Sequence, residues 1–369
     1  MSNEQTPADR RFRVGRVAVT RRGKRGTWVA DFSRDGRHCR QTLGTANRKA
    51  AESKAGVLNG ELEAGVFRPA PPPVPLAGAA ADFLTHLAAR DRSARTLAKY
   101  RGVLAGVVAW LGERRVTRLG QLTPGHFDRY QAARRAARHR KTVYTEGVII
   151  KQFTRWAKTR RLSTADPLAE VRLDKPPVER QPCPGPAEVA RLLAAAPPAL
   201  RAPLAVLAYT GLRAGELCRL RPGDVRDGFA HVVNRAGAET KTRRSRAVPV
   251  HPRLAAVLGG LPPHVREWLF EEAAGRPLST KTLHARFVKL AGSLGLPTGR
   301  GTGYVVHSLR HFFETRCVNG RVPQVVVDRW MGHRPNGAMG DLYYALDDAQ
   351  SRTFMAEVKF GGDPGEERT

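Results

Sequence analysis

Apolar residues recur every three or four positions over much of this chain, which is the spacing of one face of an α-helix. In residues 76–166, this pattern predicts four helices, over Ala79–Ala89, over Ser93–Leu111, from Thr123 onward, and over Val143–Thr159. Thr123 precedes Pro and Gly and has the character of a helix start. We therefore expect this region to be an all-helical domain.

A period of two replaces the helical period near the start of the chain. Roughly alternating apolar positions from Val14 to Val19 predict one strand, Trp28–Phe32 predicts a second strand, and Arg37–Thr42 could form a third. A helical pattern of Ala and Leu follows between Ala51 and Leu62. Residues 11–66 are thus expected to form a small basic sheet with one helix. Such a module can place strands in a groove of DNA, although a cap with solvated charges would have the same pattern.

Both patterns occur in residues 183–360. The predicted helices are Ala187–Ala196, Pro203–Thr210, Pro252–Leu258, Pro263–Phe270, Thr280–Leu294, Ser308–Val318 and Pro323–Met331. Two strands are predicted, over Phe229–Val233 and Thr240–Val250, around a basic turn. The expected fold class is therefore mainly α with small β-sheets (α+β).

Proline-rich stretches separate these regions. Pro69–Pro75 is typical of a stiff, extended linker, and Lys175-Pro-Pro-Val178 lies in a second linker. The predicted order is a disordered N-terminus (1–10), a first module (11–66), a linker (67–75), a helical domain (76–166), a linker (167–182), a mixed domain (183–360) and a loose polar tail (361–369).

The charge of the chain indicates its partner. The 63 Lys and Arg residues outnumber the 33 Asp and Glu residues, which gives a formal charge of +30 and a pI near 11.2. Such self-repulsion is tolerated mainly when a polyanion neutralises it, so nucleic acid is the first expected partner. A GC-rich genome would explain the abundance of Arg, but it explains the shortage of acids less easily.

Several other classes of protein are disfavoured. The four cysteines lie far apart and form no Cys-x-x-Cys pair, which argues against a zinc knuckle or a disulfide framework and suits a reducing cytoplasm. The start of the chain lacks the apolar core of a signal peptide. No run of about 18 apolar residues occurs, so no membrane span is expected.

Basic side chains gather at three places where phosphate contacts are expected. The candidates are Arg21, Arg22, Lys24 and Arg25 in the first module, Arg138, Arg140, Lys141, Lys151 and Arg155 in the helical domain, and Arg243 and Arg244 in the predicted hairpin. The alternative for each cluster is a solvated surface.

Candidate chemistry is confined to short segments of the last domain. Arg213 follows a glycine turn at a helix start for which Thr210 is a plausible N-cap, and Glu216 can hold it across one helical turn. The remaining candidates are Lys241 ahead of the hairpin turn, His307 and Arg310 on one helix face, His333 at a helix end, and Tyr343 and Tyr344 beyond it.

These residue types can perform one kind of chemistry together. No cluster of Asp and Glu indicates a two-metal site, and no Gly-x-x-x-x-Gly-Lys loop indicates nucleotide hydrolysis. Two arginines, a lysine and two histidines can stabilise a phosphoryl group in transit without metal. A tyrosine can attack phosphorus, and Lys241 or a histidine can protonate the departing 5′ oxygen. The pattern predicts phosphodiester exchange with no cofactor.

In this order, Thr210-Gly-Leu-Arg213-x-x-Glu216-Leu, Thr240-Lys241…Val248-Pro, His307-Ser-Leu-Arg310-His311, Met331-Gly-His333 and a following tyrosine resemble the signature of the tyrosine recombinase (phage integrase) family. The resemblance covers the chain from about residue 11. It implies an arm-site-binding domain in residues 11–66, a helical core-binding (SAM-like) domain in residues 76–166, and a mixed α/β catalytic domain in residues 183–360.

The resemblance also implies roles for the residues that would bind phosphate. Arg213 and Arg310 would grip the non-bridging oxygens of the scissile phosphate, and His333 would hydrogen-bond it. Glu216 would support the helix of Arg213. His307 would act as general acid and base.

Two further roles follow from the same resemblance. Lys241 would protonate the leaving 5′ oxygen, and a tyrosine would form a 3′-phosphotyrosyl bond. The family commonly places this tyrosine nine residues after the last histidine, where this chain has Leu342. The Met339-Gly-x-x-Tyr343 spacing favours Tyr343 as the nucleophile, with Tyr344 as the alternative.

The implied activity is site-specific recombination that integrates or excises a mobile element. The implied partners are duplex DNA with core and arm sites and three further copies of the chain in a tetramer, and a host DNA-bending protein could assist. The expected location is the cytoplasm, at the nucleoid. Two alternatives are a non-catalytic DNA-binding protein on this scaffold and DNA relaxation of the type IB topoisomerase kind, against which the arm-type module argues.

Overall fold

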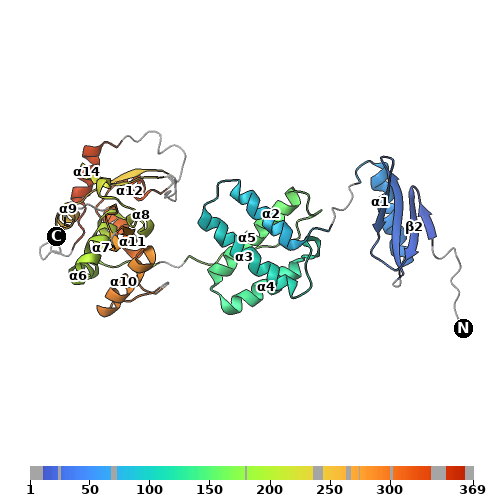
Figure 1. Ribbon diagram of the computed structural model, residues 1–369, viewed down its shortest axis with the longest axis horizontal. Coiled ribbons are helices and arrows are strands. Elements are labelled where there is room, and N and C mark those ends of the chain that lie inside the picture. Colours follow the sequence, from blue (N-terminus) through green and yellow to red (C-terminus); the bar gives the residue numbers. More distant parts are fainter. Residues whose placement is uncertain are drawn as a thin grey trace. The chain divides into compact units, whose positions relative to one another are not determined.

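A computed structural model describes residues 11–23, 26–67, 73–178, 181–235, 244–262, 267–273, 275–299, 302–333 and 346–361. The chain divides into two units, Met1–Pro177 and Val178–Thr369. Figure 1 labels their helices and strands and colours them in chain order. The point of division lies within the predicted linker 167–182. Apolar side chains gather into three separate buried clusters, which also include Phe67 and Leu168 of the predicted linkers. The predicted division into three domains stays a prediction.

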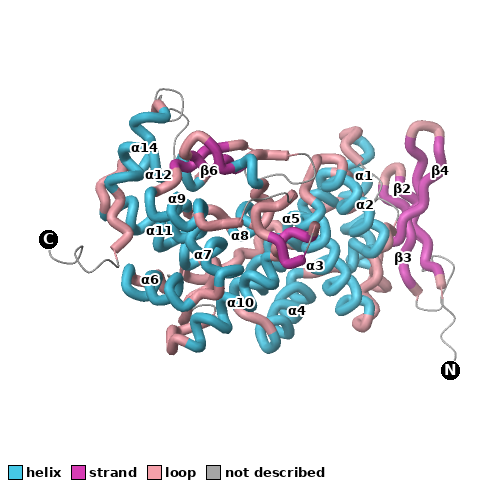
Figure 2. The backbone as a smooth tube through the Cα atoms, turned by 60° about the vertical axis from the view of Figure 1, so that its left-hand side comes forward, coloured by secondary structure: helices cyan, strands magenta, loops and turns pink. Residues whose placement is uncertain are grey.

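The first described segment is a four-stranded antiparallel sheet whose strands follow one another in chain order (Figure 2). Its strands are β1 (Arg11–Val14), β2 (Val17–Arg22), β3 (Thr27–Arg34) and β4 (Arg37–Thr42), and helix α1 (Arg48–Glu63) packs on it. The predicted sheet with one helix is confirmed. The valines predicted as one strand belong to two, because the chain turns at Gly15, where φ is 52°, and Val14 pairs with Val17.

The second segment is all helical, as predicted. Its elements are α2 (Leu76–Ala88), α3 (Ala94–Gly112), the short 3-10 helix η2 (Leu119–Gln121), α4 (Pro124–Ala137) and α5 (Arg140–Thr159). Side-chain caps set two of the starts: the Ser93 hydroxyl accepts from the N–H of Thr96, and that of Thr123 accepts from the N–H of His126.

The second unit surrounds the buried helix α7 (Pro198–Thr210), against which α11 (Ser308–Asn319) packs. Its other helices are α6 (Pro186–Ala195), α8 (Ala214–Leu217), η3 (Pro222–Asp224), α9 (Pro252–Gly259), α10 (Thr280–Ser293), α12 (Gln324–Met331) and α14 (Asp348–Glu357). Strands β5 (Val225–Arg226), β6 (Phe229–Val232) and β7 (Arg246–Pro249) form one antiparallel sheet, and β8 (Glu271–Ala273) and β9 (Arg276–Pro277) form another.

Three predicted elements of this unit need correction. The helix predicted over Pro263–Phe270 is wrong for its described part, because residues 267–270 form bends and the N–H of Leu269 bonds to the carbonyl of Leu220. Helix α7 begins before Pro203, which lies inside the helix. The strand predicted from Thr240 is observed only over β7, and its first residues lie outside the described part. Among the described helices, none is long and apolar enough to cross a membrane.

Candidate active site

The corner between α7 and α8 presents Arg213. Helix α7 ends at Gly211 in a left-handed conformation with φ of 63°, and a Cβ atom there would lie 2.5 Å from Cδ1 of Phe313. Glycine is therefore required by both the backbone and the packing. The prediction that Thr210 caps the next helix is wrong. Thr210 is the last residue of α7, where its hydroxyl donates to the carbonyl of Val206, and Arg213 itself is the N-cap of α8.

Glu216 is the buried carboxylate of the site. Its Oε2 accepts from the backbone N–H of Arg213 at 2.9 Å, and its Oε1 accepts from Nη1 of Arg213 at 3.0 Å, so the predicted contact between these residues is confirmed. Arg246 adds two bonds, from Nη1 to Oε1 at 3.1 Å and from Nη2 to Oε2 at 2.6 Å. Burial alone would raise the pKa of Glu216, but the bonds and charge of Arg246 and then of Arg213 outweigh it and lower the pKa to about 2.

Replacing Glu216 by Gln is expected to lower the free energy of unfolding by about 3 kcal/mol at pH 7, because two guanidiniums lose their counter-charge. The pKa of Glu216 falls from 4.5 to about 2 on folding, so its contribution is present above the unfolded value and is lost as the pH falls toward the folded one. Denaturant unfolding of wild type and Glu216→Gln should therefore converge between pH 5 and pH 2.

A matched control for this prediction is Glu267→Gln. Glu267 forms an exposed ion pair with Arg221 in the same unit, with 55% of its side chain exposed. Because exposed pairs contribute little, the control should unfold like wild type at every pH. A stability difference for Glu216→Gln that does not change with pH would contradict the assigned role of its charge.

Among the candidate cations that the structure describes, Arg310 is the most buried, with 3% of the residue exposed. Its Nη1 donates to the carbonyl of Gly211 at 2.6 Å, and its Nη2 donates to the carbonyl of Met331 at 2.7 Å. These bonds join α11 to the ends of α7 and α12 and fix the plane of the guanidinium. Burial lowers the pKa of Arg310 to about 10, and the nearby charge of Arg213 contributes to the shift. The site is thus strongly electropositive.

The end of α12 brings His333 to Arg310. Gly332 ends the helix in a left-handed conformation with φ of 64°. Nε2 of His333 then lies 2.9 Å from Nη2 of Arg310, and its Nδ1 lies 3.3 Å from Oδ1 of Asp328. Since a guanidinium can only donate, Nε2 accepts a hydrogen bond from Arg310, and the N–H at Nδ1 donates one to Asp328.

His307 lies one helical turn before Arg310. It is the N-cap residue of α11, is exposed, and has its ring edge-on to that of His311 with 5.0 Å between the ring centres. The structure therefore brings Arg213, Glu216, Arg310 and His333 together. His307 lies at the start of the helix that carries Arg310. The predicted Lys241, Tyr343 and Tyr344 lie outside the described residues.

Arg246 belongs to the same site and was missed by the sequence reasoning. Its side chain is 6% exposed, and its Nε donates to the carbonyl of Trp330 at 2.7 Å. A signal was available, because Arg246 precedes the apolar Val248 by two positions and so shares its face of strand β7. Val248 is fully buried, which places Arg246 on the inward face.

The basic residues predicted to contact phosphate differ in exposure and in their bonds within the protein. Arg22, Arg138, Arg140, Lys141, Arg155 and Arg244 are exposed, and Lys24, Arg25 and Arg243 lie outside the described residues. Nε of Arg21 donates to the carbonyl of Gly26 at 2.9 Å. The Lys151 ammonium donates to the carbonyls of Val171 and Ala169, so it holds the segment after α5 in this conformation. The DNA contacts of all these residues stay predictions.

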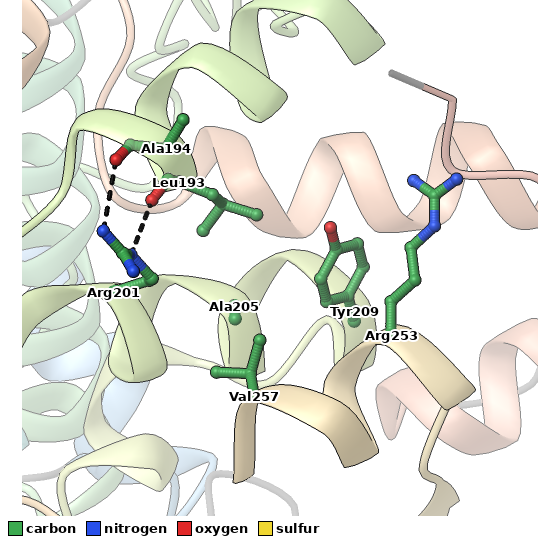
Figure 3. A pocket seen from close by; sticks show the side chains of 7 residues that line it. All are labelled: Leu193, Ala194, Arg201, Ala205, Tyr209, Arg253 and Val257. Atoms are coloured by element: carbon green, nitrogen blue, oxygen red, sulfur yellow. Dashed lines mark hydrogen bonds between the residues drawn. The ribbon is translucent and has the colours of Figure 1, made fainter. Parts of the chain in front are cut away.

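A separate cavity of about 340 Å³ lies among α6, α7 and α9. Figure 3 shows Arg201 at one side, where it bonds to the carbonyls of Leu193 and Ala194, and Tyr209 and Arg253 at the other. No residue of the candidate site described above lines this cavity, so the two are distinct.

Comparison with known proteins places this geometry in a family. Residues 185–350 match the phage integrase family, and residues 80–161 match the phage integrase N-terminal SAM-like domain. The tyrosine recombinase XerC of Rhodospirillum centenum (strain ATCC 51521 / SW) is 31% identical over an alignment of 275 residues, which covers 66% of this chain and 75% of the relative. This chain belongs to the tyrosine recombinase (phage integrase) family. A second relative of this integrase, XerC of Methylobacterium sp. (strain 4-46), is 29% identical over 62% of the chain and 75% of the relative.

Solved structures of other integrases share the fold. A lambda integrase dimer bound to a COC′ core site superposes with a TM-score of 0.61 at 18% identity and covers 98% of each chain. A lambda integrase tetramer bound to a Holliday junction gives a TM-score of 0.60 at 19% identity over 94% of this chain and 97% of that one. The predicted α+β architecture with an N-terminal β-sheet module is therefore confirmed.

Proposed function

We propose that this integrase breaks and rejoins duplex DNA at defined sites through a 3′-phosphotyrosyl intermediate, in the integration or excision of a mobile element. The observation that carries the proposal is the clustering of three guanidiniums around one buried carboxylate, with Arg310 held in place by backbone carbonyls. An excess of positive charge fixed before the substrate arrives is suited to the charge that develops on a phosphoryl group in transit.

In the proposed reaction, Arg213 and Arg310 bind the non-bridging oxygens of the scissile phosphate. The hydroxyl of Tyr343 attacks phosphorus, the bond to the 5′ oxygen breaks, and Lys241 gives that oxygen a proton. As general base, His307 takes the phenolic proton of Tyr343, and as general acid it returns that proton when the step reverses. The phosphotyrosyl bond conserves the energy of the phosphodiester, so a 5′-hydroxyl from another strand can reverse the step without an external energy source.

The proposed hydrogen bond from His333 to the phosphate requires a hydrogen on Nε2. Its Nε2 accepts from Arg310 in the described arrangement. To donate to a phosphate oxygen, Nε2 must carry a proton, which requires the other tautomer or the imidazolium form. We therefore assign to His333 a change of tautomer or of ring orientation when phosphate binds.

The proposed partners follow from charge and from the relatives. Lambda integrase has been captured on a core site and as a tetramer on a Holliday junction, and we propose the same substrate and assembly for this chain. The basic residues of the first module would bind arm sites, and those of α4 and α5 would bind the core site, with assistance from a host DNA-bending protein. The proposed location is the nucleoid in the cytoplasm.

The proposal predicts covalent linkage to DNA with neither metal nor ATP. We would incubate the full chain, in EDTA and without nucleotide, with nicked duplexes that tile the DNA flanking its own gene, since a nick near the cleavage point lets the released strand diffuse away. An SDS-resistant protein–DNA adduct on one duplex is the expected result. An absolute requirement for Mg²⁺ would contradict the mechanism, and tight binding of a duplex without any adduct would favour a non-catalytic DNA-binding protein.

A defined adduct site also separates recombination from DNA relaxation. A recombinase should cleave a single duplex of the set and exchange strands when two copies of that duplex are present. The second assay compares supercoiled plasmids with and without this sequence. Equal rates of relaxation for the two plasmids would indicate activity of the type IB topoisomerase kind.

A further inference from the structure

One arginine outside the predicted set connects the elements of the site. Arg246 lies on β7, and its guanidinium bonds to both oxygens of Glu216, which also holds Arg213. Its third bond runs from Nε to the carbonyl of Trp330 at the end of α12. A single side chain thus joins the start of α8 to the end of α12.

Arg246 is tightly packed at both Glu216 and Gly332. The bond from Nη2 to Oε2 of Glu216 is 2.6 Å, and both side chains are nearly buried, with 6% of Arg246 and 3% of Glu216 exposed. At the other end, a Cβ atom on Gly332 would lie 3.1 Å from Cδ and Nη1 of Arg246. Gly332 is the residue directly before His333, so Arg246 packs against the turn that orients the histidine.

Arg246 and Arg310 bond to successive backbone carbonyls at the end of α12. Arg246 takes the carbonyl of Trp330, and Arg310 takes the next carbonyl, that of Met331. These carbonyls lack helical partners at a C-terminus, so the two guanidiniums complete the helix end. A shift of Arg246 would therefore move the end of α12 relative to Arg310 as well as Glu216 relative to Arg213.

We propose that Arg246 is a positioning residue for DNA strand cleavage. It orients Arg213 through Glu216, and it orients His333 and Arg310 through the end of α12. Its charge is used within the protein, because Nη1 and Nη2 bond to the two carboxylate oxygens of Glu216 and Nε bonds to the carbonyl of Trp330. This inference rests on the proposed function, because it concerns the arginines that would bind the scissile phosphate.

A positioning role can be separated from a merely structural one through the charge of the phosphate. If Arg246 acts by aiming Arg213 and Arg310 at the non-bridging oxygens, its loss matters only while those oxygens are charged. A methylphosphonate linkage replaces one of them by a neutral methyl group, which removes the charge that the arginines stabilise. A loss of fold, by contrast, would slow cleavage of both linkages equally.

The experiment uses full-length Arg246→Gln and Arg246→Lys. The probe is the nicked duplex on which wild type forms its adduct, with either phosphate or, in each stereoisomer, methylphosphonate at the cleavage point. Adduct formation is timed in a single turnover from preformed complexes, and affinity is measured separately by mobility shift. Arg246→Gln should slow cleavage at the phosphate about 100-fold, as expected when reacting groups are misplaced by about 1 Å. It should slow cleavage at one methylphosphonate isomer by less than about 10-fold.

Arg246→Lys should lie between wild type and Arg246→Gln, because an ammonium keeps the charge but cannot form the fork to Glu216. The matched control is Arg316→Gln. Arg316 lies in the last turn of α11, at the end away from Arg310, and its Nε donates to the carbonyl of Lys359 at 2.7 Å. It should cleave both linkages within about threefold of wild type, since exposed or distant contacts couple weakly to the site.

The possible results are distinct. Wild-type rates for Arg246→Gln, or equal slowing on both linkages, would overturn the positioning role while leaving the proposed function intact. If Arg246→Gln does not fold, Arg246→Lys decides by the same comparison of linkages. Absence of any adduct with wild type would instead overturn the proposed function, and the inference with it.

Discussion

Replacing Tyr343 by Phe is expected to abolish the SDS-resistant adduct while leaving affinity for the nicked duplex unchanged. The substitution removes the phenolic oxygen that would attack phosphorus and keeps the aromatic ring. The choice of Tyr343 rests on its spacing from Met339 and Gly340, since all three lie outside the described residues. Denaturing gel electrophoresis of the complexes, with mobility shift on the same samples, checks both parts.

The neighbouring Tyr344 supplies the matched control. Adjacent side chains leave the backbone in different directions, so we expect only one of the two hydroxyls to reach the phosphorus. Tyr344→Phe should therefore form the adduct at close to the wild-type rate. Loss of the adduct in Tyr344→Phe alone would transfer the nucleophile to that residue, and retention of the adduct in both single variants would rule out each as the sole nucleophile.

Replacing Arg310 by Lys is expected to slow adduct formation about 1,000-fold, with affinity for DNA changed only severalfold. The guanidinium of Arg310 bonds to Gly211, Met331 and His333 at once. One ammonium cannot keep this geometry and also face a phosphate. Loss of one preorganised donor to a developing oxyanion costs about 100- to 1,000-fold in other enzymes.

Single-turnover cleavage of the nicked duplex is the measurement for Arg310→Lys. Arg316→Lys is its control, because it makes the same exchange on the same helix, where the side chain binds the carbonyl of Lys359. The control should cleave within about threefold of wild type. Cleavage by Arg310→Lys within tenfold of wild type would remove Arg310 from the proposed phosphate-binding set. Denaturant unfolding of both variants distinguishes this result from loss of the fold.

Local sequence patterns were enough to locate most helices. Apolar periodicity together with capping residues such as Ser93 and Thr123 defines both ends of α3 and the start of α4 to within a few residues. The errors arose where tertiary contacts override the local pattern. The bends at residues 267–270 depend on a bond from Leu269 to the distant Leu220, and the buried surroundings of α7 tolerate Pro203 within the helix.

The same distinction applies to the site. Contact between Arg213 and Glu216 could be predicted, because residues three apart on a helix are neighbours. The partners of Arg310 could not, since Gly211 lies 99 positions away in the sequence and is contacted through its carbonyl, which has no signature in the residue type. Arg246 reaches Glu216 across 30 positions and depends on how β7 packs against α8.

The way Arg310 is held also limits how this protein can evolve. Two of its three partners are main-chain carbonyls, which no substitution can delete. Met331 can therefore drift among apolar residues of similar size without loss of its bond to Arg310. Gly211 has no such freedom, because any side chain would meet Phe313. Selection is therefore expected to keep glycine at position 211 and to allow several apolar residues at position 331. A survey of natural variants should find position 211 invariant and position 331 diverse.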